Sequence, residues 1–326
     1  MKLSIIVPVY KCEQYIIECF QSLLTNLTDD VEAIFVDDCS PDRSFKILSD
    51  LKNRFPDKNI EIYQNDVNMG SGCTKNNGLS HAKGEYVTFL DSDDFTDDGY
   101  YYKMLDIALK NDADVVCSDI VMYEDNIIKD DLNVEINSDD DYILFDTDSI
   151  LSSWSAASAC NKIFKRKVIS GYKFKENSKC DDLCFTIPAV ACSKKIYYCL
   201  NNRYYYRMTK GSLTRAVNIK KYTDSVDCIL LTLNILSSIN YNAADLFIVT
   251  NFIPLVKNSL YGLNTKLKRE FLKYLEEIYE NNEILFKKHL IDNSYALERD
   301  LRCIDNNQII ISYILDNNIM GLMNLR

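Results

Sequence analysis

An apolar strand that runs into clustered carboxylates is the part of this chain best suited to chemistry. Residues 84–94 read Gly-Glu-Tyr-Val-Thr-Phe-Leu-Asp-Ser-Asp-Asp. A strand this apolar is normally buried on both faces, and open α/β sheets bind ligands at the carboxyl ends of such strands. Carboxylates held this close repel one another unless a cation lies among them. The cluster therefore predicts a divalent metal with oxygen ligands, placed to bind the phosphates of a nucleotide.

The Asp-x-Asp pattern alone is weak in this chain, because aspartate pairs are common and Asp139–Asp141 matches it by chance. A calcium loop of the EF-hand type is an alternative reading. Starting at Asp91, that loop would need an acid or amide at Phe95 and a glycine at Thr96, so the alternative fails. The surrounding elements must decide.

Alternating strands and helices surround the acids and must position them. Apolar runs predict strands at 3–10, 33–36, 60–63 and around Tyr86. Apolar residues at helical spacing predict helices at 13–24, 43–54 and 71–82. This alternation predicts an α/β fold with a mostly parallel central sheet flanked by helices.

Five motifs follow one another along the first part of the chain. They are Pro8-Val9-Tyr10, Val36-Asp37-Asp38-Cys39-Ser40-x-Asp42, Asn68-x-Gly70 with Lys75-Asn76-x-Gly78, Gly84-Glu85-Tyr86, and Leu90-Asp91-Ser92-Asp93-Asp94. Their order and spacing resemble those of family-two glycosyltransferases with the GT-A fold. The resemblance covers residues 1 to 210 and fades beyond them.

The resemblance implies a site for a nucleotide-sugar donor. Asp38 would receive the base, a uracil ring bound through its N3 hydrogen, and Asp37 would support Asp38. Asp91 and Asp93 would hold Mn²⁺ or Mg²⁺ on the diphosphate, with Asp93 as the direct ligand. The other residues that the resemblance assigns to donor binding are Pro8, Val9, Tyr10, Asn68, Gly70, Lys75, Ser92 and Arg207.

A second acidic pair, Asp181-Asp182, resembles the Glu-Asp-x-x-Phe motif of the same family, with Asp181 in the Glu position. By that resemblance Asp182 is the general base. Inversion by direct displacement needs one carboxylate that takes the proton of the acceptor hydroxyl, and no protein nucleophile. The alternative is that either acid only caps the helix that runs to Cys192.

The acceptor side is predicted from fewer signals. Asp94 would orient sugar hydroxyls, and the sole tryptophan, Trp154, would line the acceptor groove together with Asp181, although a lone tryptophan is more often a core residue. Arg207 lies in a Tyr-Tyr-Arg segment that resembles the family's basic loop, and would neutralise the departing diphosphate.

Two residues depart from the family pattern. Cys39 stands where glycine is usual, which is expected to narrow the nucleotide pocket. Lys75 stands where arginine is usual, which keeps the charge but loses bidentate phosphate geometry.

Other nucleotide-binding classes fit less well. Gly70-Ser71-Gly72 begins like a dinucleotide fingerprint, but its third glycine would fall on Lys75. A Walker loop needs Gly-Lys-Ser/Thr, which does not occur in the sequence.

We expect two domains. Residues 1–217 would form the catalytic domain, with a nucleotide-sugar half over about 1–120 and an acceptor half over about 121–217. Residues 218–326 would form a helical C-terminal domain, with helices at 222–236, 243–260, 266–278 and 307–315. Polar residues interrupt its apolar stretches, so none is expected to span a membrane. Peripheral membrane contact through Lys266-x-Lys268-Arg269 and homo-oligomer formation through these helices both stay open.

Composition limits the partners. A net charge of −11 argues against nucleic acid, because a phosphate backbone calls for a basic surface. The 12 cysteines are scattered along the chain and no signal peptide precedes the first strand. This predicts reduced thiols in a cytoplasmic protein, with a place at the inner face of the membrane left open.

Together, the residues and the family resemblance predict a metal-dependent, inverting glycosyltransferase of the hexosyl or N-acetylhexosaminyl class. It would move a sugar from a UDP-sugar to a hydroxyl of a glycan, a lipid-linked saccharide or a glycoprotein in bacterial surface polysaccharide or glycoprotein assembly. The alternative is a non-catalytic nucleotide-sugar-binding or assembly subunit with the same fold, which donor hydrolysis would distinguish.

Overall fold

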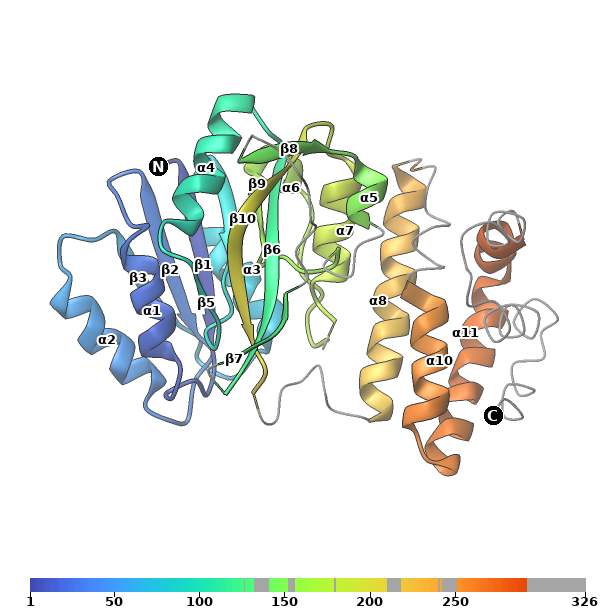
Figure 1. Ribbon diagram of the computed structural model, residues 1–326. Coiled ribbons are helices and arrows are strands. Elements are labelled where there is room, and N and C mark those ends of the chain that lie inside the picture. The colour runs from blue at the N-terminus through green and yellow to red at the C-terminus, as the bar shows by residue number, and fades with distance from the viewer. Residues whose placement is uncertain are drawn as a thin grey trace. The chain divides into compact units, whose positions relative to one another are not determined.

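The chain folds as two units, Met1–Ser212 and Leu213–Arg326, which are described separately. A computed structural model describes residues 1–125, 127–131, 141–151, 156–178, 180–209, 218–239, 241 and 251–291 (Figure 1). The division lies close to the boundary expected after residue 217. That domain assignment stays a prediction.

The first half of the sheet in unit one is parallel. β1 (Leu3–Val9) pairs with β2 (Val31–Asp37) on one side and with β4 (Tyr86–Phe89) on the other, and β3 (Ile60–Gln64) extends β2. In this register Asp37 lies opposite both Val9 and Gln64. Parallel strands end at the same edge, so the residues that follow β1, β2 and β4 meet there.

The second half of the sheet is mixed. The described strands follow the order β3-β2-β1-β4-β9-β6-β10-β5, with β7 paired to β6 and β8 to β10. The bounds of these further strands are β5 Phe95–Thr96, β6 Val115–Glu124, β7 Ile127–Asp131, β8 Tyr142–Phe145, β9 Lys162–Lys165 and β10 Ile196–Arg207. β10 is parallel to β6, whereas β9 is antiparallel to both of its neighbours. The predicted α/β fold with a central sheet is confirmed.

Helices cover both faces of this sheet, as Figure 1 shows. Their bounds are α1 Ile16–Leu24, α2 Ser44–Arg54, α3 Ser71–His81, α4 Tyr100–Asn111, α5 Thr147–Leu151, α6 Arg166–Ile169 and α7 Leu183–Ala191. Phe20 of α1 stacks on Phe35 of β2 with ring centroids 5.7 Å apart. Phe35 pairs with Val7, whereas its neighbour Ile34 pairs with Ile6, so Ile6 points to the opposite face.

Helix α3 packs on that opposite face at unusually short range. A Cβ added at Gly78 would lie 2.4 Å from Cγ2 of Ile6, so only glycine permits this approach. The same face carries Phe185 of α7, whose ring packs against Phe89 at 5.5 Å and Phe164 at 5.6 Å. Helices α3 and α7 are thereby fixed next to the carboxyl end of β4.

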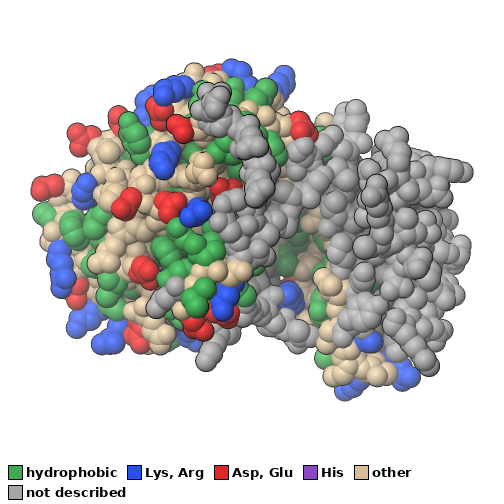
Figure 2. Space-filling view, viewed as in Figure 1, with side chains coloured by type: hydrophobic (Ala, Val, Ile, Leu, Met, Phe, Trp, Pro, Cys, Tyr) green, Lys and Arg blue, Asp and Glu red, His purple; other side chains and the backbone are tan. Residues whose placement is uncertain are grey.

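Acidic and basic side chains are interspersed over the described part of the face shown in Figure 2. The acidic stretch at 124–148 contributes β7 and β8 among its described residues. Ile127, Ile128 and Leu144 on these strands are exposed.

Unit two is helical in its described residues, as expected. It contains α8 (Ile219–Ser238), α10 (Ile253–Gly262) and α11 (Thr265–Ile291). Helices α8 and α11 pack through the rings of Tyr222 and Phe271, and Tyr274 donates a hydrogen bond to Asp227. None of the helices in the described ranges is long and apolar enough to cross a membrane. The helix predicted at 307–315 and the start of the one predicted at 243–260 lie outside the described residues.

Candidate active site

Polar residues from three adjacent strands meet at the carboxyl edge of the sheet. Tyr10 follows β1 and is 42% exposed, whereas Val9 before it is buried. Asp37 ends β2 and Asp38 follows it, and the acid loop, residues 91–94, comes just after β4. The parallel register thus gathers the predicted donor residues at one place.

Asp38 is buried and anchors the neighbouring loop. Its Oδ1 accepts hydrogen bonds of 2.8 Å from the Asn65 side chain and from the backbone N–H of Met69, and its Oδ2 accepts one of 2.8 Å from Gly70 N–H. Asn68 also donates to the backbone carbonyl of Asp38, at 3.5 Å. A carboxylate has about four acceptor sites, and three of them are occupied here. The predicted contact of Asp38 with a base stays a prediction.

Asp37 is fully buried and holds the turn that follows β2. Its Oδ2 accepts hydrogen bonds from the backbone N–H of Ser40, at 3.0 Å, and from the Gln64 side chain, at 2.9 Å. Its Oδ1 is buried with no hydrogen-bond partner among the described residues. Asp37 therefore fixes the turn that follows β2. Its predicted support of Asp38 stays a prediction.

Cys39 in this turn is exposed and has a φ of +55°. Only glycine adopts that left-handed conformation without steric cost. Cys39 therefore strains the backbone of this turn, and its expected narrowing of the nucleotide pocket stays a prediction.

Replacing Cys39 by glycine should stabilise the protein. The left-handed conformation costs about 1–2 kcal/mol for a residue with a Cβ, and the added freedom of glycine in the unfolded chain offsets about 0.5–1 kcal/mol of that gain. We expect Cys39→Gly to raise the Tm by about 1–3 °C in calorimetry. Cys192→Gly is the control, because Cys192 is also exposed but has a φ of −83°, so glycine there should lower the Tm. A lower Tm for Cys39→Gly would show that the turn is unstrained.

The acid loop is tied to the end of β10. Asp94 is 1% exposed, and its Oδ2 accepts a hydrogen bond of 2.6 Å from the Tyr204 hydroxyl. Its Oδ1 accepts one of 2.7 Å from the backbone N–H of Arg207. Both oxygens of Asp94 thus bind protein groups, and its predicted contact with sugar hydroxyls is an untested assignment.

Burial and mutual repulsion shape the electrostatics of the loop. Burial raises the pKa of Asp91 to about 6, with Asp182 and Asp93 adding to the shift and Lys75 opposing it. Burial also raises the pKa of Asp93, and it raises that of Asp94 well above its usual range, with help from both neighbouring acids. A divalent cation would relieve this repulsion, so the acid loop fits one chemically.

The loop does not form a closed metal cage. No three Asp, Glu, His or Cys side chains among the described residues are grouped to hold an ion. Mg²⁺ and similar ions are commonly held by one or two carboxylates plus substrate phosphates and water. The predicted pair, Asp91 and Asp93, matches that number of carboxylates, and its role as metal ligands stays a prediction.

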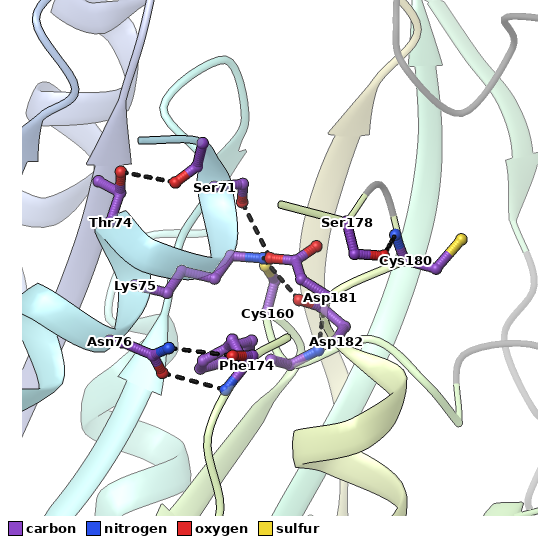
Figure 3. Close-up of polar contacts among 12 residues, drawn as sticks. Ser71, Thr74, Lys75, Asn76, Cys160, Phe174, Ser178, Cys180, Asp181 and Asp182 are labelled. Atoms are coloured by element: carbon purple, nitrogen blue, oxygen red, sulfur yellow. Dashed lines mark hydrogen bonds and ion pairs between the residues drawn. The ribbon is translucent and has the colours of Figure 1, made fainter. Parts of the chain in front are cut away.

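The second acidic pair surrounds a buried lysine, as Figure 3 shows. Lys75 of α3 is 3% exposed, and its Nζ lies 3.1 Å from Oδ2 of Asp181 and 2.5 Å from Oδ1 of Asp182. Ser71 donates a hydrogen bond of 3.1 Å to the same Asp181 oxygen. Burial alone would lower the pKa of Lys75, but the two aspartates outweigh it and hold that pKa well above its usual range. Lys75 is therefore a charged partner of the acid pair.

Asp182 stands at the N-terminus of α7 without capping it. Its side chain makes no capping hydrogen bond to the helix. Its Oδ2 instead accepts a hydrogen bond of 3.3 Å from the backbone N–H of Ala159. Among the described residues, this geometry disfavours the alternative in which Asp182 is only a helix cap.

Arg207 ends β10 and is surrounded by partners. Its Nε donates to the backbone carbonyl of Asp93 at 2.8 Å, and one of its terminal nitrogens pairs with Glu18 at 2.6 Å. Its guanidinium also lies 5.1–5.2 Å from the ring centroids of Tyr15, Phe95 and Tyr123. These contacts hold Arg207 next to the acid loop, and the predicted contact with a departing diphosphate stays a prediction.

The remaining predicted residues are placed unevenly. Pro8 lies within β1, and Ser92 is buried in the acid loop. Trp154 lies outside the described residues. Asn65 and Tyr204 contact predicted site residues, but the sequence reading did not single them out as site residues. The run of three tyrosines at Tyr204–Tyr206 is a sequence signal that could have pointed to Tyr204. No pattern in the sequence pointed to Asn65.

Comparisons with known proteins identify the family of this chain. The sequence profile of glycosyl transferase family 2 matches residues 4–172. Glycosyltransferase GlyA of Streptococcus pneumoniae is 27% identical over 253 residues, which are 74% of this chain and 35% of GlyA. The poly(ribitol-phosphate) beta-glucosyltransferase of Bacillus spizizenii is 31% identical over 212 residues, which are 63% of this chain and 32% of that protein. The chain thus spans about a third of the length of each relative.

Solved structures show the same fold. Residues 1–349 of TarS from Staphylococcus aureus, crystallised with UDP-GlcNAc, superpose with a TM-score of 0.76 at 20% identity. The alignment covers 99% of this chain and 90% of that one.

Proposed function

Because the chain belongs to glycosyl transferase family 2, we propose that it transfers a sugar from a UDP-sugar to an acceptor hydroxyl with inversion, and that it depends on a divalent metal. The observation that carries this proposal is the meeting of two acidic groups near one buried cation. The acid loop follows β4, the Asp181–Asp182 pair precedes α7, and Lys75 interacts electrostatically with both groups.

In the proposed reaction, the acceptor oxygen attacks the anomeric carbon of the donor. The bond from that carbon to the diphosphate oxygen breaks, and the electron pair leaves with the nucleoside diphosphate. Asp182 takes the proton of the acceptor hydroxyl. Lys75 and the backbone N–H of Ala159 hold the two carboxylate oxygens of Asp182 in place.

Asp91 and Asp93 would hold Mn²⁺ or Mg²⁺, which when bound would stabilise the negative charge of the departing diphosphate. Arg207 would help to hold Asp93 in place, because its Nε donates a hydrogen bond to the backbone carbonyl of Asp93. Asp38 would contact the uracil, and Asp37 would support Asp38. These assignments follow from the family resemblance and from the positions at the sheet edge.

The relatives suggest the substrates. TarS was crystallised with UDP-GlcNAc, and the relative from Bacillus spizizenii is named a glucosyltransferase of poly(ribitol-phosphate). We therefore propose a UDP-hexose or UDP-N-acetylhexosamine donor and an acceptor hydroxyl on a bacterial surface polymer. Membrane contact at Lys266, Lys268 and Arg269 and pairing of copies through the C-terminal helices stay predictions.

Nucleotide binding with and without metal tests this proposal. UDP is used at one concentration, about 100 times its Kd in the presence of Mn²⁺. At that concentration it should raise the free energy of unfolding by about 2.7 kcal/mol when Mn²⁺ is present. We expect this rise with Mn²⁺ and a much smaller one with EDTA, and we expect ADP, GDP and CDP to give little effect. Equal stabilisation by UDP with Mn²⁺ and with EDTA would overturn the metal assignment.

The competing function is a non-catalytic nucleotide-sugar-binding or assembly subunit. Asp93 and Asp182, both present in the sequence, count against it. Slow release of UDP from a UDP-sugar in the presence of Mn²⁺ would support the enzyme. Tight binding of every UDP-sugar without any UDP release or transfer would support the subunit.

A further inference from the structure

We propose that Tyr204 is a positioning residue for the metal ligands, and that it acts through Asp94. This inference rests on the proposed function, because it assigns to Tyr204 the task of fixing the loop that carries Asp91 and Asp93. Tyr204 lies in the tyrosine run just before Arg207, and no site role was predicted for it.

The Tyr204 hydroxyl joins the two ends of the acid loop. Its oxygen accepts a hydrogen bond of 3.2 Å from the backbone N–H of Asp91, and its hydrogen is donated to Oδ2 of Asp94 at 2.6 Å. Within the loop, the backbone N–H of Asp94 donates to the carbonyl of Asp91 at 3.0 Å. One hydroxyl therefore completes a closed ring of hydrogen bonds around the segment that carries both proposed ligands.

Tyr204 is itself held rigidly. It lies inside β10, opposite Ile120 of β6 on one side and Thr96 of β5 on the other. The next residue, Tyr205, stacks on Phe95 with ring centroids 4.6 Å apart and an angle of 3° between the rings. The Tyr204 ring is buried, so its hydroxyl has a fixed position against which the loop can be set.

The effect on metal binding follows from the two groups whose hydrogen bonds the Tyr204 hydroxyl completes, the Asp91 N–H and Oδ2 of Asp94. Without it, the Asp91 N–H and one oxygen of the buried Asp94 would lose their partner, and the loop would have to move to recover one. Such movement displaces the carboxylates of Asp91 and Asp93. Groups that orient metal ligands in this way typically contribute about 10–100-fold to metal affinity.

The test compares Tyr204→Phe with Tyr86→Phe in the full chain. Tyr86 is also buried, in β4 of the same sheet, and its hydroxyl donates to the backbone carbonyls of Ala108 and Ala113 at 3.2 Å and 3.1 Å. Both variants lose one buried hydroxyl and should lose comparable stability. Only Tyr204→Phe should weaken Mn²⁺-dependent UDP binding, by about 10–100-fold in calorimetry, with UDP binding in EDTA unchanged.

A double-mutant cycle adds a second route to the same answer. Asp94→Asn removes an acceptor from the other end of the contact, so it should weaken Mn²⁺-dependent UDP binding as well. If the Tyr204–Asp94 contact carries the effect, the combined variant should lose less than the product of the two single losses.

The outcomes separate the two proposals. If the unaltered chain binds UDP more tightly with Mn²⁺ but Tyr204→Phe binds it equally well, Tyr204 is only a core residue and the inference is wrong. Fully independent losses in the cycle would also overturn it. If the unaltered chain shows no dependence on Mn²⁺ at all, the metal part of the proposed function fails, and the inference fails with it.

Discussion

Asp93→Ala should abolish metal-dependent UDP binding while leaving the protein folded. Residues that only orient a metal ligand contribute about 10–100-fold to metal affinity, so the loss of the direct ligand should cost more than about 100-fold. Stability should not fall, because burial disfavours the charged form of Asp93, and the charge of Asp93 also helps to raise the pKa of Asp94. Calorimetric titration of UDP with Mn²⁺ measures the effect directly.

Asp98→Ala is the matched control for this variant. Asp98 lies in the same segment but is exposed, so its removal changes the net charge equally without touching the loop. We expect Asp98→Ala to bind UDP with Mn²⁺ like the unaltered chain. If both variants lose the same affinity, the effect is a general one of charge, and Asp93 is not a ligand.

The parallel half of the fold could be predicted from the sequence because its signals are local. The strands at β1, β2 and β3 are apolar runs followed by turn residues, and the helices between them carry apolar residues at helical spacing. The predicted helix at 43–54 and the observed α2, Ser44–Arg54, agree to within one residue. Neighbouring residues determine such elements, so one sequence is enough to find them.

The antiparallel insertion at β9 could not be found in this way. β9 is a four-residue strand, Lys162–Lys165, with a lysine at each end, and it fills the place between β4 and β6. Lys162 is nevertheless fully buried, and its ammonium donates to the carbonyl of Ser158 and to the side chain of Asn161. Burial of this lysine lowers its pKa. A prediction based on apolar runs misses a short buried strand that has a charged residue at each end.

The candidate site shows the same difference between local motifs and long-range contacts. Asp38, Asp93 and Asp182 could be assigned because they stand in recognisable motifs. The long-range contacts of the site acids could not be predicted, because Lys75 meets Asp182 across 107 positions of sequence and Tyr204 meets Asp94 across 110. The structure pairs Lys75 with two carboxylates, and its predicted role as a donor-binding cation stays a prediction. Long-range pairing depends on the sheet order, which local patterns do not contain.

Asp182→Asn should lower turnover by roughly 10²-fold or more and leave UDP binding with Mn²⁺ near normal. Asparagine keeps the shape of the side chain but cannot take the acceptor proton. Folding should survive, because Lys75 retains Asp181 as a charged partner at 3.1 Å. Initial rates of sugar transfer and of donor hydrolysis should fall together, since water as acceptor needs the same base.

Asp181→Asn distinguishes a catalytic base from a counter-ion of Lys75. Each substitution removes one of the two negative charges that lie next to the Lys75 ammonium. A pure charge effect should therefore lower the turnover of both variants equally. As a base, Asp182 should affect kcat far more than Asp181, whose proposed contact with the acceptor should appear mainly in KM. If Asp182→Asn instead unfolds or loses UDP binding, Asp182 is structural, and another group must take the proton.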